Sequence, residues 1–228
     1  MKRALVIIDM QNDFITGVLG TQEARDIVDD MAEYIRDFDG DIIATLDTHY
    51  TSGYMKSMEG KKLPVPHCIY GTDGRNLNAT VFEACKQNPH KFSMLSKTTF
   101  GSIILPDRLE DYEEIYMCGV CTDICVVSNA LLLKAYNPNK PLYVLSDLCA
   151  GVTPEKHLSA LDVMESCHID IIKAFNRERT VKPINPTIQE EKAEEMPIEE
   201  FTGASEDNAE AIEVDVDMNI DEGEGYDS

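Results

Sequence analysis

Two short segments of the chain carry side chains that could bind one divalent metal ion. The first reads Thr-Leu-Asp47-Thr-His49, and the second, Pro-His67-Cys, places its histidine eighteen residues further on. One carboxylate and two imidazoles with a position left open suit a catalytic metal better than a closed structural site. Glu59, between the two segments, is a candidate fourth ligand. Zinc is the first candidate for the metal, but iron(II) and manganese accept the same nitrogen and oxygen ligands.

A cysteine stands where an apolar run gives way to a helical pattern, in Gly119-Val-Cys-Thr-Asp-Ile-Cys125. Thr122 can cap a helix there, which places Cys125 in the first turn. The N–H groups and the helix dipole at that position favour a thiolate, so a lowered pKa is expected. The same N–H groups could hold an oxyanion. The alternative is an ordinary buried cysteine. The spacing of Cys118, Cys121 and Cys125 also suggests a metal–sulfur cluster, but a strand and a turn would spread those thiols apart.

Asp9 and Lys97 are the other candidates for chemistry. Asp9 ends the apolar run Val-Ile-Ile, where a carboxylate is costly unless it is paired, and Lys97 follows a later apolar run. An aspartate between a lysine and a cysteine can take the thiol proton, while the lysine fixes the geometry. Phe14, five residues after Asp9, is a candidate aromatic wall of the same cleft. Each of these residues also has an ordinary structural interpretation, so the prediction depends on their convergence.

Short apolar runs that alternate with amphipathic stretches must position these residues. Such a pattern predicts a three-layer α/β/α domain with a mostly parallel six-stranded sheet, Rossmann-like in arrangement. Ligands of such sheets lie beyond the carboxyl ends of the strands, where Asp9, Asp47, Lys97, Cys125 and Asp147 are all expected to converge. The expected strands are 4–8, 41–46, 92–95, 115–119, 142–146 and 169–174, and the expected helices are 22–38, 78–86, 122–136 and 154–167. The long connection 47–76 is expected to be functional.

The net charge of −22 is concentrated near the carboxyl end of the chain. Residues 186–228 contain 16 acidic side chains and one lysine, and prolines interrupt the pattern from residue 183 onward. This composition predicts a catalytic domain at 1–183 and a disordered acidic tail at 184–228, either a solubilising appendage or a partner-binding segment. From this composition we expect no nucleic-acid-binding basic patch, no signal peptide and no membrane span. A cytoplasmic location with free thiols is expected.

Taken together, these segments resemble the isochorismatase-like cysteine hydrolases, and among them the nicotinamidase/pyrazinamidase group. The segments that carry the resemblance fall within residues 3–173. They are Val6-Ile-Ile-Asp-Met-Gln-Asn-Asp-Phe14, Asp47-Thr-His49, Pro66-His-Cys-Ile-Tyr-Gly-Thr-Asp-Gly74, Lys97-Thr-Thr-Phe-Gly101 and Gly119-Val-Cys-Thr-Asp-Ile-Cys125.

The resemblance implies a role for each site residue. Cys125 corresponds to the nucleophile, Asp9 to the base and Lys97 to the third catalytic residue. The bond between Val120 and Cys121 corresponds to a cis peptide that builds an oxyanion hole from the N–H groups of Cys121 and Cys125. Asp47, His49 and His67, with Glu59 as a further candidate, correspond to ligands of a metal that holds the pyridine nitrogen in nicotinamidases; Phe14, Phe100 and Val120 are candidate substrate contacts.

The implied reaction converts nicotinamide to nicotinic acid and ammonia through a thioester, in NAD salvage, and the resemblance also implies a homo-oligomer. Cys125 argues against vinyl-ether hydrolysis, because isochorismatases proper lack this nucleophile. One departure concerns the substrate wall: many nicotinamidases have a Trp shortly before Pro-His-Cys, and this chain has none. Two alternatives therefore stay open, a related amidase acting on another small amide such as a carbamoyl or ureido compound, and an inactive scaffold whose tail recruits partners.

Overall fold

Six strands form one sheet in the computed structural model, which describes residues 2–175. The strands are β1 (Arg3–Ile8), β2 (Asp41–Asp47), β3 (Phe92–Lys97), β4 (Glu114–Val120), β5 (Leu142–Ala150) and β6 (Asp170–Ile172). Their order is β3-β2-β1-β4-β5-β6 and every pairing is parallel. The predicted α/β class and strand number are confirmed. The expected domain end at 183 and the acidic tail at 184–228 lie outside the described residues.

The sheet reverses its direction of growth beside β1, and this reversal positions the site. From β1 the chain adds β2 and β3 on one side, then returns to add β4, β5 and β6 on the other. The crevice beyond the carboxyl ends of β1 and β4 is therefore the switch point where parallel α/β sheets bind ligands. The residues that follow these two strands are Asp9 and the segment that contains Cys125.

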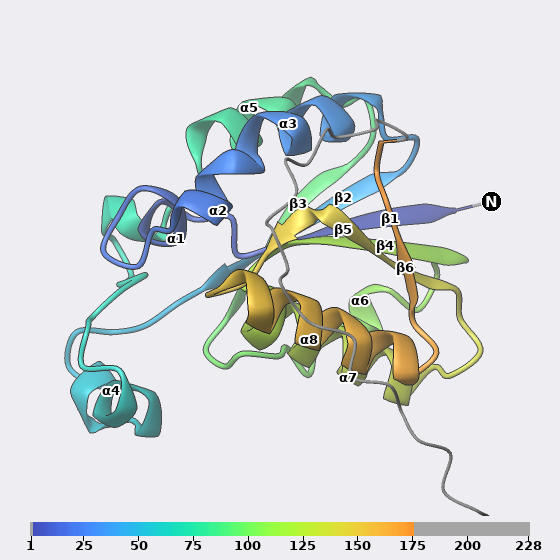
Figure 1. Cartoon of the computed structure of the whole chain (residues 1–228). Coiled ribbons are helices and arrows are strands. Elements are labelled where there is room, and N and C mark those ends of the chain that lie inside the picture. The colour runs from blue at the N-terminus through green and yellow to red at the C-terminus, as the bar shows by residue number, and fades with distance from the viewer. Residues whose placement is uncertain (1, 176–228) are drawn as a thin grey trace, which may run out of the picture. The chain divides into compact units, whose positions relative to one another are not determined.

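Helices cover both faces of the sheet, as Figure 1 shows. One face carries α2 (Gln22–Asp26), α3 (Val28–Asp37) and α5 (Ala79–Gln87), and the other carries α6 (Leu105–Arg108), α7 (Val127–Tyr136) and α8 (Pro154–Ser166). The short helices α1 (Asn12–Ile15) and α4 (Met58–Lys62) lie beyond the carboxyl ends of the strands. No helix within residues 2–175 combines the length and apolar character needed to cross a bilayer.

The central strands are apolar because both of their faces are covered. All residues of β1 from Ala4 to Ile8 are buried, as are those of β2 from Ile42 onward. Burial on both sides explains why these strands read as continuous apolar runs rather than alternating ones. β4 and β1 approach each other closely at Gly119, which has a φ of +120° and where a Cβ would collide with the carbonyl of Ile8.

Several element boundaries differ from the sequence-based expectation. The helix expected at 22–38 is two helices that meet at Ile27, and the helix expected at 122–136 begins with a π-helical turn, Thr122–Val126. Thr122 does not cap it; its hydroxyl instead lies 2.8 Å from Nδ1 of His157. The connection after β2 contains α4 and two short 3-10 turns, Tyr54–Lys56 and Asp73–Arg75.

Asp147 was expected to end the fifth strand and join the cleft, and that expectation is wrong. The strand continues to Ala150, with a register shift against β4 between Met117 and Gly119. The Asp147 carboxylate accepts hydrogen bonds from the N–H groups of Ala174 and Phe175, in the segment that follows β6. The polar residue thus satisfies backbone donors at the sheet edge and does not contact the other candidates.

Candidate active site

Asp9, Lys97 and Cys125 meet at the carboxyl ends of three strands. The Lys97 ammonium lies 2.6 Å from Asp9 Oδ2 and 3.5 Å from Cys125 Sγ. All three residues are buried. The fold therefore brings the predicted carboxylate, amine and thiol together.

The strand register explains why Lys97 reaches Asp9 from two strands away. Lys97 is the register partner of Asp47, and β2 lies between β3 and β1. The lysine stem crosses this gap, and its ammonium lies 3.5 Å from Asp47 Oδ1. Asp9 is fixed by Thr45, whose hydroxyl donates to Oδ1 at 2.7 Å and accepts from the Asp9 N–H at 3.2 Å.

Burial and the neighbouring charges both shift the pKa values of the three groups. It raises the pKa of Asp9, while the ammonium of Lys97 acts in the opposite direction. Burial would lower the pKa of Lys97, but Asp9, Cys125 and Asp47 outweigh it and raise that pKa above its ordinary value. The lysine is therefore a permanent cation that keeps the neighbouring carboxyl ionisable.

The thiol pKa differs from the sequence-based expectation. Burial, and then the charge of Asp9, raise the pKa of Cys125 well above its ordinary value, although Lys97 acts against them. This direction is opposite to the lowering expected from a helix N-terminus, because burial disfavours the charged thiolate. Burial therefore disfavours the thiolate form of Cys125 in this arrangement.

Backbone geometry around the cysteine agrees with the resemblance. The peptide bond between Val120 and Cys121 is cis. The carbonyl of Cys121 accepts hydrogen bonds from the N–H groups of Ile124 and Val126, which closes the π-helical turn that contains Cys125. Asn129, fully buried in α7, donates to the Cys125 carbonyl at 2.7 Å and so anchors the turn.

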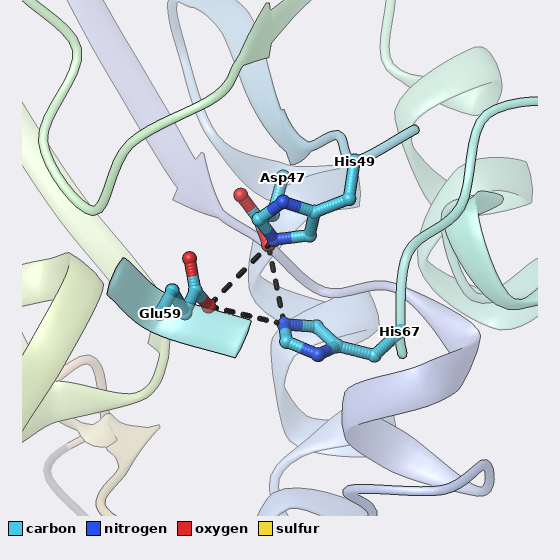
Figure 2. A group of neighbouring side chains, drawn as sticks. All are labelled: Asp47, His49, Glu59 and His67. Carbon is cyan, nitrogen blue, oxygen red and sulfur yellow. Dashed lines mark ion pairs between the residues drawn. The ribbon is translucent and has the colours of Figure 1, made fainter. Parts of the chain in front are cut away.

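A second cluster lies directly beside this group, and Figure 2 shows its side chains pointing toward one another. The four members offer one ligand atom each, all within 4.8 Å of one another. They are Asp47, His49, Glu59 and His67. Asp47 links the two groups, because its Oδ1 faces Lys97 and its Oδ2 faces the histidines. All four predicted ligand residues therefore come together.

The distances within this cluster fit a bound metal ion. His49 Nε2 lies 3.6 Å from Glu59 Oε1, and His67 Nε2 lies 3.5 Å from Asp47 Oδ2 and 3.4 Å from Glu59 Oε1. Ligands about 2.1 Å from a tetrahedral zinc ion stand about 3.4 Å from each other. Buried His49 Nε2 lies 2.8 Å from Asp47 Oδ2, yet at an angle that makes no hydrogen bond.

The charges of the cluster also call for a cation. Burial would lower the pKa of His67, but the carboxylates of Asp47 and Glu59 outweigh it and raise that pKa to about 10. Nδ1 of His67 lies 2.9 Å from the Val65 carbonyl, which can only accept, so this nitrogen carries hydrogen. Nε2 then faces the two carboxylates, where a metal ion would supply the positive charge in place of a proton.

The three candidate substrate contacts lie in different surroundings. The Phe14 ring packs against His67, with 5.4 Å between centroids, at the edge of the metal cluster. Val120 is buried in the core next to the cis bond. Phe100 is 46% exposed, and Asn129 holds its carbonyl at 3.0 Å. Their roles toward a substrate stay predictions.

Sequence reasoning missed several residues that hold the site together. Gln11 is buried, and its amide both accepts from the Asp47 N–H at 2.7 Å and donates to the Asp47 carbonyl at 2.8 Å. Asp13 accepts from the N–H of Cys68, next to the ligand His67, at 2.7 Å. Both residues lie in the Asp-Met-Gln-Asn-Asp-Phe segment. Their closeness to Asp9 in the sequence is the signal that could have identified them as site residues.

A cavity of about 260 Å³ lies at the other end of the sheet and takes no part in this arrangement. Arg3 at the start of β1 lines it, whereas Asp9 follows the end of that strand. The reactive side chains and this cavity therefore lie at opposite ends of β1.

Comparison with known proteins agrees with the fold and the motifs. The chain belongs to the isochorismatase domain family, whose model matches residues 3–198. It is 30% identical over 175 residues to an isochorismatase family protein of Bacillus subtilis, which covers 71% of this chain and 93% of that protein. It is 28% identical over 186 residues to the nicotinamidase/pyrazinamidase of Mycobacterium tuberculosis, with 75% and 98% covered.

A solved structure extends the comparison to three dimensions. The pyrazinamidase of Pyrococcus horikoshii in complex with zinc superposes with a TM-score of 0.63 at 27% identity, over 76% of this chain and 99% of that one. The fold and these relatives together identify the protein as a hydrolase of the amidase type.

Proposed function

We propose that the protein hydrolyses nicotinamide to nicotinic acid and ammonia, with Cys125 as nucleophile and a divalent metal held by Asp47, His49, Glu59 and His67. The observation that carries this proposal is the contact of Lys97 with both Asp9 and Cys125, directly beside four converging metal ligands. We further propose a role in NAD salvage and a cytoplasmic location. Relatives named nicotinamidase support the choice of substrate.

The first half of the reaction forms a thioester. Asp9 takes the thiol proton as Cys125 Sγ attacks the amide carbon, so no free thiolate has to be stored in the buried site. The N–H groups of Cys121 and Cys125 hold the developing oxyanion. The C–N bond then breaks, and Asp9 returns its proton to the nitrogen, which leaves as ammonia.

The second half hydrolyses the thioester. Water attacks the acyl carbon while Asp9 removes its proton; the C–S bond then breaks and Asp9 returns that proton to the sulfur, which releases nicotinic acid and restores the Cys125 thiol. Lys97 stays protonated throughout and keeps Asp9 ionisable and in place. A metal ion at the four-residue cluster would act as a Lewis acid that binds the pyridine nitrogen. Phe14, beside His67, would provide an apolar wall for the ring.

A related amidase acting on another small amide is the second candidate. The absence of tryptophan from the chain favours it, because the Trp that many nicotinamidases carry shortly before Pro-His-Cys has no counterpart at that position here. Relatives of that kind often dispense with the metal, so tight metal binding would count against it.

Ammonia release from nicotinamide by the zinc-loaded protein tests the proposal. We expect turnover in the wild type, loss of about 100-fold or more in Cys125→Ala, and no change in Cys167→Ala, which removes an exposed thiol in another part of the chain. Folded, metal-replete protein that releases no ammonia would disprove the assignment of nicotinamide. Carbamoyl and ureido compounds would then be tested with the same variants.

A further inference from the structure

Tyr54 lies where the metal cluster meets the short helix α4, and the proposed mechanism leaves it without a role. It is 3% exposed in a connection whose other aromatic side chains, Tyr50 and Tyr70, are 56% and 62% exposed. Burial of a tyrosine in a surface connection indicates that its ring and hydroxyl have specific partners.

The ring and hydroxyl of Tyr54 contact both histidines of the cluster. Its centroid lies 4.9 Å from that of His49 and 5.3 Å from that of His67, in edge-to-face arrangements. Its hydroxyl donates to the Leu63 carbonyl at 2.7 Å and lies 3.3 Å from Nδ1 of His67. Because the hydroxyl hydrogen of Tyr54 is used by Leu63, its oxygen is left to accept. That oxygen shares the single hydrogen on His67 Nδ1 with the Val65 carbonyl, which lies closer at 2.9 Å.

The same residue also holds both ends of α4, the helix that carries Glu59. At the start of the helix, the Tyr54 carbonyl accepts the Ser57 hydroxyl at 2.7 Å, and Ser57 Oγ accepts the N–H of Gly60 at 2.9 Å. At the end, the Tyr54 hydroxyl binds Leu63, the residue that follows the helix.

Gly60 shows how tightly this arrangement is packed. A Cβ at residue 60 would collide with the carbonyl oxygen of Tyr54. The backbone of α4 can therefore rest on Tyr54 only because residue 60 is glycine, and any larger residue would lift the helix. Glu59, the neighbour of Gly60, would move with it.

We infer that Tyr54 is a positioning residue of the metal centre, which orients His67 through its hydroxyl and holds Glu59 in coordinating position through α4. This inference rests on the metal centre of the proposed function and adds to it the residue that assembles the ligand set. Groups that hydrogen-bond to the far nitrogen of a ligating histidine fix the orientation of its ring, and their removal typically weakens metal binding about 10- to 100-fold.

Zinc affinity of the full chain, measured by competition with a chromophoric chelator, tests the inference. We expect Tyr54→Phe to bind zinc about 10-fold more weakly or worse. Tyr50→Phe removes an exposed hydroxyl from the same connection and should bind like the wild type. Gly60→Ala disturbs the same contact between Tyr54 and α4 from within the helix and should weaken binding as well, so the test does not depend on one variant that might misfold.

A cobalt(II) spectrum and a double-mutant cycle separate positioning from general damage. Glu59→Gln should change the ligand-field bands of bound cobalt, and Gly60→Ala should reproduce that change. If Gly60→Ala acts through Glu59, it should cost little further affinity in the Glu59→Gln background. Full additivity of the two losses would contradict the inference.

The outcomes distinguish this inference from the proposed function. Wild-type protein that binds zinc while Tyr54→Phe and Gly60→Ala bind it equally well would overturn the role of Tyr54 and leave the metal centre intact. Wild-type protein that binds neither zinc nor cobalt would refute the metal centre itself. Circular dichroism of each variant shows whether the fold is retained.

Discussion

Lys97 contacts both catalytic partners and a residue of the metal cluster. Its ammonium faces Asp9 at 2.6 Å and two further groups, Cys125 and Asp47, at 3.5 Å each. A buried cation with three anionic or ionisable neighbours is stable only because they are present together. Removal of its charge therefore leaves Asp9 as a buried carboxylate without a counter-ion.

Lys97→Met should produce a stability loss that depends on pH. Burial already raises the pKa of Asp9, and loss of the opposing ammonium raises it further above its unfolded value of about 3.9. A carboxyl with a raised folded pKa stabilises the fold below the unfolded pKa, and this stability is lost as pH rises through the folded pKa. Relative to wild type, the loss in the free energy of unfolding should be small near pH 4 and approach about 3–5 kcal/mol at pH 8.

Urea unfolding of the metal-free proteins between pH 4 and pH 8 measures this difference. Lys91→Met, an exposed lysine just before the same strand, is the matched control and should show little change at any pH. A Lys97→Met penalty that is constant across the range would mean that Asp9 does not take up a proton when its partner is lost.

Residue types and positions predicted which groups converge, but not what holds them. Asp9, Asp47, Lys97 and Cys125 each follow or end a parallel strand, and that rule brings them to one edge. Gln11 and Tyr54 could not be found in this way, because their partners lie on other segments and depend on loop conformation. The pKa of Cys125 was mispredicted because local sequence shows a helix start but not the depth of burial.

At the scale of elements, the distance between β1 and β4 decides whether base and nucleophile meet. Ile8 and Gly119 are register partners at the last position that the two strands share, immediately before Asp9 and the cis bond. The close approach requires glycine for two reasons, a φ of +120° and a Cβ that would strike the Ile8 carbonyl. The switch point is thus built with its two strands in close backbone contact.

Gly119→Ala should therefore destabilise the protein and also reduce turnover. The collision with Ile8 adds to the conformational cost, and we expect a loss of about 3 kcal/mol or more in the free energy of unfolding. Gly71→Ala is a matched control, because Gly71 has a φ of +85° with no atom within 4 Å of an added Cβ. Gly71→Ala should lose only about 1–2 kcal/mol in the free energy of unfolding, which is the cost of placing a side chain at a positive φ.

Chemical denaturation and ammonia release on both variants provide the measurements. Equal losses of stability would show that β4 can move away from β1 at little cost. Normal turnover in Gly119→Ala would show that the spacing of these strands does not control the approach of Asp9 to Cys125.

Elements with continuous apolar or strongly amphipathic patterns were predicted well, and those with mixed patterns were not. β1 and β2 were placed to within one residue at each end, because burial on both faces leaves a clear signature. The fifth strand was predicted to end at Ser146, four residues too early. Its polar residues lie where the register against β4 shifts, and such a shift cannot be seen in the sequence of one strand. The short helices α1, α4 and α6 have too few residues for a periodic signal.

At the scale of the whole molecule, the candidate site is contained in a limited part of the chain. The residues that form it run from Asp9 to Cys125, and the last described strand, β6, ends at Ile172. Sequence composition placed the end of the catalytic domain at residue 183, whereas the isochorismatase domain match extends to residue 198. These two boundaries make different predictions about which residues the enzyme needs.

Truncation after residue 183 tests the boundary drawn from composition. If the acidic segment is an appendage, the shortened chain should keep the melting temperature and kcat/KM of the full chain, because every catalytic and metal-binding candidate remains. Removal of residues 184–228 deletes the 16 acidic side chains counted in 186–228, so poorer solubility near neutral pH is expected. A second truncation, after residue 198, is the control: if it alone retains stability and activity, residues 184–198 belong to the folded enzyme and the compositional boundary is wrong.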